Sequence, residues 1–525
     1  MSAVNPGQEP RPWWRNRYAA GALGLGLALL VWQLLPTTVD RPLVPAMAGV
    51  AVWMAIWWVF EVVPIPVTAM LPLLVLPMSG IAPLKAVSAN YGKPIIFLFL
   101  GGFMLALALE RSNLHRRIAL NIVRTIGSQP RRLLLGFMVA SSFLSMWISN
   151  TASVMVMLPI GLSVIGQAEG SGGSEAQRRG FKTALMLGIA YAANIGGMAT
   201  PVGTPPNLVF LEVYRKLFPA APEVGFAQWM TIGLPVAVTF VVLAWWVLGW
   251  VVFDLPATSV DAPAASRAGS SDPSNTVQAA YQALGPMRRD EWVAGGIFAL
   301  AAGLWVTGAD LQLGSLTITG WRGWLGLQQV GDASVAVGCA IALFLVPSAD
   351  RPGETLLDWG TAQHRTPWAL LLLFGGGFAL AGGFKSSGLS AAIGGGVSGL
   401  VGVAPIAVII LVCVALTFLT ELTSNTATAT LLLPILANAA PGLGIDPRAL
   451  MIPATLSASC AFMMPVSSPT QAIVFGSGHV RIKDMVRAGV WLNVVGVVVV
   501  VGLFGLLAGP ALGIDLGVVP AWATR

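Results

Sequence analysis

Long apolar stretches separated by short basic clusters dominate the chain. In the N-terminal part they cover residues 18–36, 44–63, 64–82 and 94–110. Each can form a helix of about 20 residues, the length that crosses roughly 30 Å of hydrocarbon. Basic residues precede the first stretch and follow the fourth. Because positive charge collects on the cytoplasmic side, four crossings would return the chain to that side. The pattern predicts membrane-spanning helices.

The composition supports this interpretation. Of the 525 residues, 56% are hydrophobic and only 10% are charged, whereas soluble proteins carry about 25% charged residues. The net charge of +7 resides in clusters at the ends of apolar stretches, which indicates cytoplasmic connections and not a nucleic-acid surface. We therefore expect an all-α integral membrane protein.

One apolar stretch, residues 133–166, is too long for a single simple crossing and has basic residues on both sides. It should enter the membrane and return as a re-entrant hairpin. Ser149, Asn150 and Thr151 fall at its midpoint. Non-helical backbone at membrane depth is tolerated only where protein or a water-filled cavity satisfies it, so this tip is a candidate binding site.

The chain contains an internal repeat. ISNTASVMVMLPI at 148–160 matches TSNTATATLLLPI at 423–435, 275 residues later. TPVGTPPN at 200–207 matches MPVSSPTQ at 464–471, 264 residues later. Two matched blocks in the same order indicate a duplication and predict a second hairpin at 405–440.

Charge predicts how the two copies are oriented. Residues 111–132 hold six arginines, whereas residues 386–407 hold no lysine or arginine. The copies should therefore face opposite sides, as in the inverted repeats of secondary transporters. We expect about eleven transmembrane helices plus two re-entrant hairpins, with the N-terminus cytoplasmic and the C-terminus outside. The expected parts are a cytoplasmic tail 1–17, a first half 18–254, a hydrophilic cytoplasmic linker 255–290 and a second half 291–525.

The repeated hydroxyl–amide–hydroxyl triplets suggest a ligand. Half-helix N-termini attract anions, while hydroxyl, amide and unwound carbonyl oxygens suit sodium. A lone triplet more often caps a helix, but duplication favours the binding interpretation. Two facing poles would hold a molecule with two carboxylates. The chain has no GxxxxGK[ST] motif, so the driving energy should come from an ion gradient.

Other polar residues allow more than one interpretation. Glu61, Glu110 and Glu421 lie in or beside apolar stretches, where a carboxylate suggests a proton relay, although pairing with a neighbouring helix or exposure at a helix end is the commoner outcome. Three histidines lie near arginines and are expected to be solvated: His115, His364 and His479. The three cysteines show no metal-binding or disulfide spacing.

Several longer motifs carry a family resemblance. They are WWVFEVVPIPVTAMLPLLVLPMSGI at 57–81, FLGGFMLALALERSNLHRRIAL at 99–120 and AIVFGSG at 472–478. Together with both SNT triplets, the chain resembles the divalent anion/sodium symporters, which carry di- and tricarboxylates or sulfate. The resemblance covers nearly the whole chain.

The resemblance implies site residues. The substrate would contact Ser149, Asn150, Thr151, Thr204, Ser424, Asn425, Thr426 and Pro469. One sodium ion would lie among Ser145, Ser149, Asn150 and Gly203, and the other among Thr420, Thr423, Asn425 and Ser467. It also implies homodimers that work by an elevator mechanism. The second loop reads SSPTQ at 467–471 where the family usually has Pro-Pro-Asn, which predicts altered selectivity at that pole.

The functional expectation is sodium-coupled symport of C4-dicarboxylates such as succinate, malate or fumarate, across a bacterial-type inner (plasma) membrane. A dicarboxylate exchanger or a carrier of sulfate or another oxyanion is the alternative on the same scaffold. An ion channel or a membrane enzyme is a more remote one, because no nucleophile–base pair, metal-ligand cluster or charged pore is visible. We expect no cofactor beyond coupling sodium ions, and the lipid bilayer but no nucleic acid as a partner.

Overall fold

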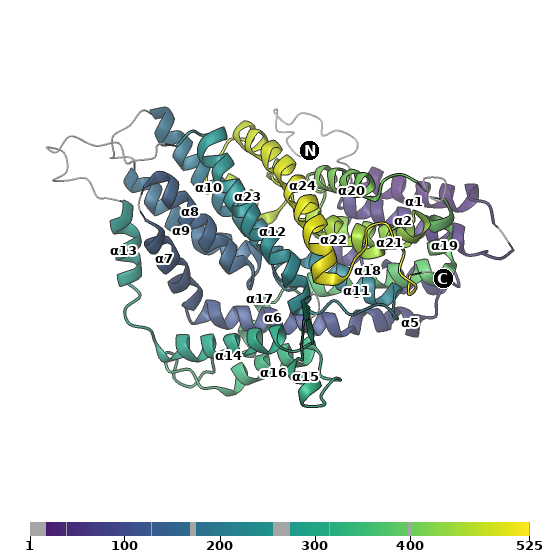
Figure 1. Cartoon of the computed structure of the whole chain (residues 1–525), viewed down its shortest axis with the longest axis horizontal. Coiled ribbons are helices and arrows are strands. Elements are labelled where there is room, and N and C mark those ends of the chain that lie inside the picture. Colours follow the sequence, from purple (N-terminus) through teal and green to yellow (C-terminus); the bar gives the residue numbers. More distant parts are fainter. Residues whose placement is uncertain are drawn as a thin grey trace, which may run out of the picture.

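The computed structural model describes residues 17–37, 39–127, 129–168, 175–255, 273–313, 316–396 and 402–523. These residues are helical apart from turns, connections and one short antiparallel hairpin (Figure 1). The expectation of an all-α protein therefore holds except at this hairpin, where Leu311 pairs with Ile318.

The first half of the chain forms twelve α-helices, a 3₁₀ turn and a π-helical turn within the described residues. They are α1 (Arg17–Leu34), α2 (Val44–Val59), α3 (Ile65–Thr68), α4 (Leu71–Met78), α5 (Leu84–Ser88), η2 (Ala89–Gly92), α6 (Pro94–Arg111), α7 (Leu114–Ile126), α8 (Pro130–Ser145), α9 (Asn150–Ala168), α10 (Glu175–Gly197), α11 (Pro205–Leu217), α12 (Phe226–Trp246) and η3 (Val247–Val252).

The second half follows after α13 (Pro273–Gln282). Its elements are α14 (Arg289–Val306), β1 (Leu311–Leu313), β2 (Leu316–Ile318), α15 (Trp321–Trp324), α16 (Asp332–Leu345), α17 (Trp359–Arg365), α18 (Trp368–Ser387), α19 (Leu389–Gly396), α20 (Pro405–Leu419), α21 (Asn425–Gly442), α22 (Pro447–Ser457), α23 (Pro469–Gly476) and α24 (Ile482–Leu512). Several helices begin with proline, whose missing N–H costs nothing in a first turn.

Four helical stretches among the described residues are long and apolar enough to cross a membrane: Leu84–Arg111, Phe226–Val252, Trp368–Ser387 and Ile482–Leu512. Six shorter apolar helices accompany them: Tyr18–Leu34, Val44–Val59, Ile65–Met78, Asn150–Gly166, Asp332–Leu345 and Pro405–Leu419. These helices support a multi-pass membrane protein. The number of eleven crossings stays a prediction.

The predicted single span 64–82 is broken into α3 and α4. Pro72, at the start of α4, has no N–H to continue the helix. The N–H of Leu73 bonds to the carbonyl oxygen of Met70. The carbonyl oxygen of Ala69 accepts from the hydroxyl of Tyr91 at 2.6 Å. At this break α18 approaches closely, since a Cβ on Gly376 would lie 2.2 Å from the carbonyl oxygen of Ala69.

The repeat found in the sequence recurs in the positions of the helices. At the 275-residue offset, α7, α8 and α9 begin at the positions equivalent to the starts of α19, α20 and α21. At the 264-residue offset, α11 begins at the position equivalent to the start of α23. Both predicted hairpins thus break into two helices at the SNT triplet.

The helices α6 and α18 carry FLGGF at 99–103 and FGGGF at 374–378, again 275 residues apart. These two equivalent helices run in opposite directions (Figure 1). Phe99, near the start of α6, packs edge-on against Phe374 in the first turns of α18, with ring centroids 5.1 Å apart. Glu110, near the end of α6, pairs at 2.5 Å with Arg365, which precedes α18. A later residue of α6 therefore contacts an earlier residue at α18, as expected for antiparallel helices.

The end of α6 is held by an ion network outside the apolar core. Arg111 pairs with Asp358 at 2.7 Å and also with Glu354. Hydrogen bonds from the backbone N–H and hydroxyl of Thr361 lower the pKa of Asp358. This network fixes the end of α6 against the start of α17.

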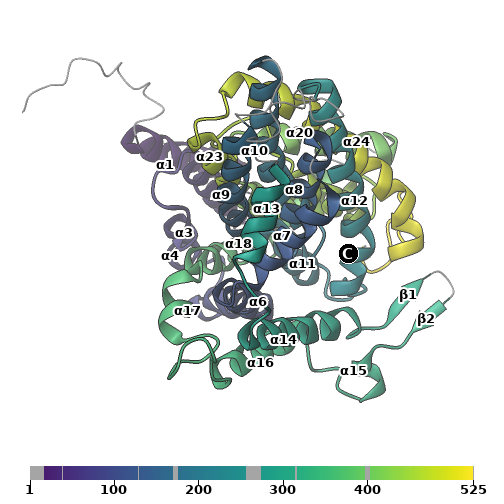
Figure 2. The same ribbon diagram turned by 90° about the vertical axis from the view of Figure 1, so that its left-hand side faces the viewer.

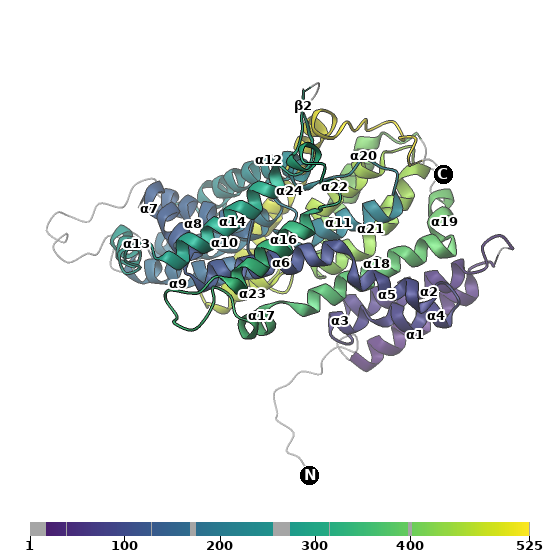
Figure 3. The ribbon, with the colours of Figure 1, turned by 90° about the horizontal axis from the view of Figure 1, so that it is seen from below.

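Each copy of the repeat packs one of its helices against the other copy. α11 packs against α21 and α22, whereas α23 packs against α9 and α10. Figure 1 shows this exchange, with α23 beside α10 and α11 beneath α21. α12 and α24 lie side by side across the molecule. From the side, β1, β2 and α15 project beyond the helices (Figure 2), and from below α14 and α16 cover α6 (Figure 3).

The tail 1–17 lies outside the described residues except for Arg17, as do 256–272 of the linker. The described part of the linker contains α13, which packs against α7 and α9. The expectation that all three histidines are solvated is wrong for His115, which is 7% exposed and whose Nδ1 lies 3.0 Å from the carbonyl oxygen of Leu109.

Candidate binding site

The first tip (residues 145–151) is a break between α8 and α9 closed by its own polar groups. The hydroxyl of Ser145 donates to Asn150 Oδ1 at 2.6 Å. The hydroxyl of Ser149 accepts from the backbone N–H of Ala152 at 3.2 Å and so caps α9. The hydroxyl of Thr200 donates to the carbonyl oxygen of Met146 at 2.5 Å and ties the tip to the following loop.

The second tip (residues 420–426) repeats the central bond. The hydroxyl of Thr420 contacts Asn425 Oδ1 at 2.8 Å and the carbonyl oxygen of Ala458 at 2.9 Å. Thr420 and Asn425 occupy the positions equivalent to Ser145 and Asn150. Thr423, also predicted as a sodium ligand, instead contacts Thr428 at 2.5 Å and the carbonyl oxygen of Leu419 at 3.1 Å.

Gly197 brings the first tip and the first loop (residues 197–207) together. A Cβ at this position would lie 2.6 Å from Asn150 Oδ1 and 3.0 Å from the carbonyl oxygen of Gly203. Two of the four predicted ligands of the first sodium ion, Asn150 and Gly203, therefore crowd a position where a side chain would clash. A third, Ser145, reaches it through its hydrogen bond to Asn150. Gly197 was not among the residues predicted for the site. Its equivalent in the second loop is Ala461, so the two loops differ at this position.

The second loop (residues 461–471) is held by Gln471. Its Nε2 donates to the carbonyl oxygen of Ala461, as Asn207 Nδ2 does to the equivalent Gly197 at 3.1 Å. Ser467 donates to Gln471 Oε1 at 3.0 Å. Thr470 and Gln471 are 1% and 0% exposed. The departure from Pro-Pro-Asn therefore lies inside the protein, and any effect on selectivity would act through the loop's shape.

The predicted substrate residues gather at helix starts. α9, α11, α21 and α23 begin at Asn150, Pro205, Asn425 and Pro469, where unpaired N–H groups favour an anion. Pro469 is exposed, Thr204 and Thr426 are buried, and the other predicted substrate residues, Ser149, Asn150, Thr151, Ser424 and Asn425, are partly exposed. Neither tip and neither loop contains a lysine or arginine.

The three glutamates have different surroundings. Glu61 is exposed just after α2, and Glu110 pairs with Arg365. Glu421 is 3% exposed, and its carboxylate accepts from the backbone N–H groups of the second loop, including Phe462 at 2.6 Å. These surroundings favour pairing or helix-end exposure over a proton relay.

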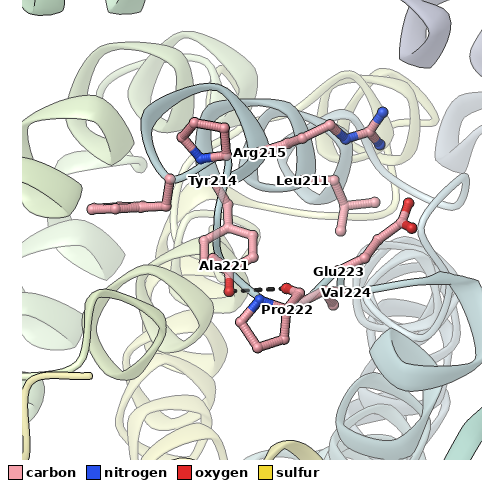
Figure 4. A pocket seen from close by; sticks show the side chains of 9 residues that line it. Leu211, Tyr214, Arg215, Ala221, Pro222, Glu223 and Val224 are labelled. Atoms are coloured by element: carbon pink, nitrogen blue, oxygen red, sulfur yellow. Dashed lines mark hydrogen bonds between the residues drawn. The ribbon is translucent and has the colours of Figure 1, made fainter. Parts of the chain in front are cut away.

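A small cavity adjoins the first tip, and a larger one lies away from both tips. A cavity of about 10 Å³, space for roughly one water, lies between Ser149 and Phe99, Gly102 and Phe103 of α6. A cavity of about 350 Å³ lies at the far end of α11 (Figure 4). There the hydroxyl of Tyr214 donates to the carbonyl oxygen of Pro222 at 3.0 Å. No predicted site residue lines this larger cavity.

Comparisons with known proteins agree with this architecture. The profile of a family described as the sodium:sulfate symporter transmembrane region matches residues 25–514. The sodium-dependent dicarboxylate transporter SdcS of Staphylococcus saprophyticus is 39% identical over 501 residues, covering 94% of this chain and 92% of that protein. The protein of the same name from Staphylococcus aureus strain MRSA252 is 39% identical over 477 residues, covering 89% and 86%.

Two solved structures share the fold. The YdaH transporter of Alcanivorax borkumensis matches with a TM-score of 0.55 at 16% identity, covering 95% of this chain and 100% of that chain. MtrF of Neisseria gonorrhoeae matches with a TM-score of 0.52 at 12% identity, covering 95% of each. At these identities the likeness concerns the fold alone.

Proposed function

The chain belongs to the sodium:sulfate symporter family, and from this premise we propose that it imports C4-dicarboxylates, such as succinate, malate or fumarate, together with sodium. It is a transporter and not an enzyme. The observation that carries the proposal is the duplicated oxygen pair, Ser145 with Asn150 and Thr420 with Asn425, each at a helix break. Hydroxyl and amide oxygens are suitable ligands for sodium.

In this proposal one dicarboxylate binds between the two tips. Its contacts are Ser149, Asn150, Thr151 and Thr204 at one pole, and Ser424, Asn425, Thr426 and Pro469 at the other. Support comes from the four helices that start at these positions. The amide nitrogen of Asn425 has no hydrogen-bond partner among the described residues, so it is available to a carboxylate.

Sodium ions supply the positive charge that the protein does not. One ion lies among Ser145, Ser149, Asn150 and Gly203, and the other among Thr420, Thr423, Asn425 and Ser467. Without a lysine or arginine at either tip, a dianion would otherwise meet only partial charges. Each ligand therefore improves the site for the other, which is the thermodynamic basis of coupling.

Transport by this proposal requires movement. The cavity of about 10 Å³ beside Ser149 is far smaller than usual ligand pockets of roughly 300–1,000 Å³. A dicarboxylate that enters beside Ser149 therefore requires the first tip to separate from α6. We propose an elevator motion within a homodimer in the inner membrane, with inverted copies, a cytoplasmic N-terminus and an outside C-terminus. The opposite directions of α6 and α18 support the inversion.

The test is uptake of labelled succinate into proteoliposomes with an inward sodium gradient or with potassium in its place. We expect sodium-dependent accumulation in the wild type and its loss in Asn425→Ala. Asn121→Ala, which removes an exposed amide on α7, serves as the matched control and should transport normally. Equal uptake in sodium and potassium would contradict the proposal. Uptake of labelled sulfate but not succinate would identify an oxyanion carrier, and uptake only against internal succinate an exchanger.

A further inference from the structure

Asn194 connects the first tip to the second loop. This residue of α10 is 1% exposed. Its Oδ1 accepts from Asn150 Nδ2 at 3.3 Å and from the hydroxyl of Thr470 at 3.0 Å. Its Nδ2 donates to the hydroxyl of Ser468 at 3.2 Å. Both polar atoms of one buried side chain are therefore engaged by residues that lie far apart in the sequence and belong to different copies of the repeat.

The hydrogen-bonded bridge through Asn194 has no counterpart at the equivalent position of the second copy. At the 264-residue offset the position equivalent to Asn194 is Ala458, which has no polar side-chain atom. Its carbonyl oxygen contacts Thr420 of the second tip. The repeat alone therefore does not account for the amide. A buried amide is costly unless it is hydrogen-bonded. Here its partners are the predicted ligand Asn150 and two residues, Ser468 and Thr470, that are adjacent in sequence to predicted ligands of the second loop.

The two ends of the bridge adjoin the proposed sodium sites. Asn150 contacts Ser145 through its oxygen and Asn194 through its nitrogen. A cation that draws in Asn150 Oδ1 must therefore also set the position of Asn150 Nδ2. At the other end, Ser468 lies between Ser467 and Pro469, and its hydroxyl is 2.6 Å from that of Thr470.

We infer that Asn194 is a positioning residue that makes the two sodium sites cooperative. Occupation of the first site orders Asn150, Asn194 then holds Ser468 and Thr470, and the second loop presents Ser467 to its ion. By linkage the effect is reciprocal, so the second ion also tightens binding of the first. The inference rests on the proposed function, because it assumes that these two clusters bind sodium.

The experiment measures the sodium dependence of succinate uptake in proteoliposomes for the wild type, Asn194→Ala, Thr470→Val and the double variant. We expect a Hill coefficient above 1 in the wild type that falls toward 1 in each single variant. The double variant should fall no further, because both changes break the same bridge. Thr470→Ser keeps the hydroxyl and should restore the wild-type value. The sodium concentration for half-maximal uptake should rise about fivefold or more.

Asn438→Ala is the matched control. Asn438 is a buried amide of α21 whose Nδ2 donates to the carbonyl oxygen of Pro434 in its own helix at 2.5 Å. Its loss removes the same group without touching either loop or tip. We expect its Hill coefficient to equal that of the wild type. An equal fall in Asn438→Ala would show general loosening and overturn the inference.

A second readout separates this inference from the proposed function. The sodium-dependent rise in melting temperature of the detergent-solubilised protein needs no substrate. A wild type without sodium-dependent succinate uptake would contradict the proposed function, while a cooperative sodium titration that Thr470→Val abolishes would still support the bridge. A wild-type Hill coefficient of 1, or one unchanged in Asn194→Ala and Thr470→Val, would overturn the bridge alone. If Asn194→Ala does not fold, the Thr470→Val and Thr470→Ser pair decides.

Discussion

The two junctions between tip and loop share one backbone plan but differ in chemistry. In the first copy the hydroxyl of Thr200 donates to the carbonyl oxygen of Met146. In the second copy Glu421 occupies the position equivalent to Met146. Its carboxylate accepts from the backbone N–H groups of Phe462 and Met463 and from the side-chain amide of Asn493 at 2.7 Å. The neutral hydrogen bond of the first junction is thus replaced, in the second, by a carboxylate that accepts from several donors.

This difference indicates that the second junction is the stiffer one. Hydrogen bonds to a charged group contribute roughly 1.5–3 kcal/mol each, against about 1 kcal/mol for a neutral pair. Asn493 also belongs to α24, so Glu421 fixes the second loop to a third element. The first tip instead depends on Thr200 and on Asn194, whose other partners lie in the second loop. The first tip is therefore expected to move more easily.

The largest effect should come from giving the second junction the chemistry of the first. Glu421→Met leaves the N–H groups of the second loop and the amide of Asn493 without an acceptor in a buried region. We expect a loss of at least about 3 kcal/mol in the free energy of unfolding, because each unsatisfied buried donor costs roughly 1–3 kcal/mol. The melting temperature in detergent should fall clearly, whereas Met146→Ala should lower it only slightly.

Glu421→Gln distinguishes an anchor from a proton relay. The glutamine amide keeps one acceptor oxygen, but its NH2 group would face the backbone N–H donors of the second loop. If Glu421 only anchors this loop, we expect intermediate stability and an unchanged dependence of uptake on pH. A fully stable Glu421→Gln protein with altered pH dependence would restore the relay interpretation.

The next largest effect concerns the two central amides. Asn→Asp keeps the size of the side chain but places a negative charge near a dianion where screening is weak. In both variants we expect succinate affinity to fall at least about tenfold, which is about 1.4 kcal/mol. Sodium binding without substrate should persist or strengthen, because a carboxylate is a good ligand for a hard cation. Scintillation proximity binding measures the first effect, and sodium-dependent thermal shifts measure the second.

The comparison predicts that Asn150→Asp lowers succinate affinity more than Asn425→Asp does. Asn150 Nδ2 donates to Asn194 Oδ1, and aspartate would set two acceptors against each other. Asn425 has no such partner among the described residues. Equal losses in both variants would argue against the asymmetry, and wild-type uptake in both folded variants would remove the amides from the site.

Much of the fold was predictable because duplication and charge leave signals in the sequence. The SNT triplets located both helix breaks, and the 275-residue offset placed the starts of α20 and α21. Charge clusters separated the apolar stretches. The break between α3 and α4 was not predicted. Pro72 is a local signal for it, but the contacts that satisfy the break come from Tyr91 and α18, which belong to other parts of the chain.

Within the site, the sequence identified side chains but not their mutual supports. Ser145 with Asn150 and Thr420 with Asn425 were named as ligands and do contact one another. Gly197 and Asn194 were missed, because an apolar helix rich in glycine and alanine gives no local reason to select them. Gly197 acts through its close approach to Asn150 within the first copy, and Asn194 through contacts with the second copy. Only the three-dimensional arrangement specifies these contacts.

A moderate effect is expected at the glycine that distinguishes the first loop. A methyl group in Gly197→Ala would meet Asn150 Oδ1 at 2.6 Å and displace it. Overpacking costs roughly 1–3 kcal/mol, so the sodium concentration for half-maximal uptake should rise about tenfold. Ala461→Gly, at the equivalent buried position, removes a methyl group and should leave that concentration nearly unchanged. Similar shifts in both variants would contradict a special role for the first loop.

The smallest effect on activity, and the sharpest test of inversion, comes from two equivalent exposed positions. Arg116 of α7 and Ala391 of α19 are exposed and 275 residues apart, while the native cysteines are buried. Cysteine at either position should leave uptake intact. A membrane-impermeant maleimide should label Ala391→Cys in whole cells but Arg116→Cys only after permeabilisation. Five arginines remain in 111–132 when Arg116 is replaced, so positive charge still holds that connection inside.

Two further positions fix the reference sides for this experiment. Val518 is exposed after α24, and Lys483 is exposed at the start of the same helix, so an outside C-terminus predicts labelling of Val518→Cys from outside and of Lys483→Cys only after permeabilisation. If Arg116→Cys and Ala391→Cys then label from the same side, the copies are parallel and the facing poles are lost as an explanation for binding two carboxylates. If they label from opposite sides, the asymmetries at Glu421, Asn194 and Gly197 are departures from an inverted duplication, which gives each tip access to one side of the membrane.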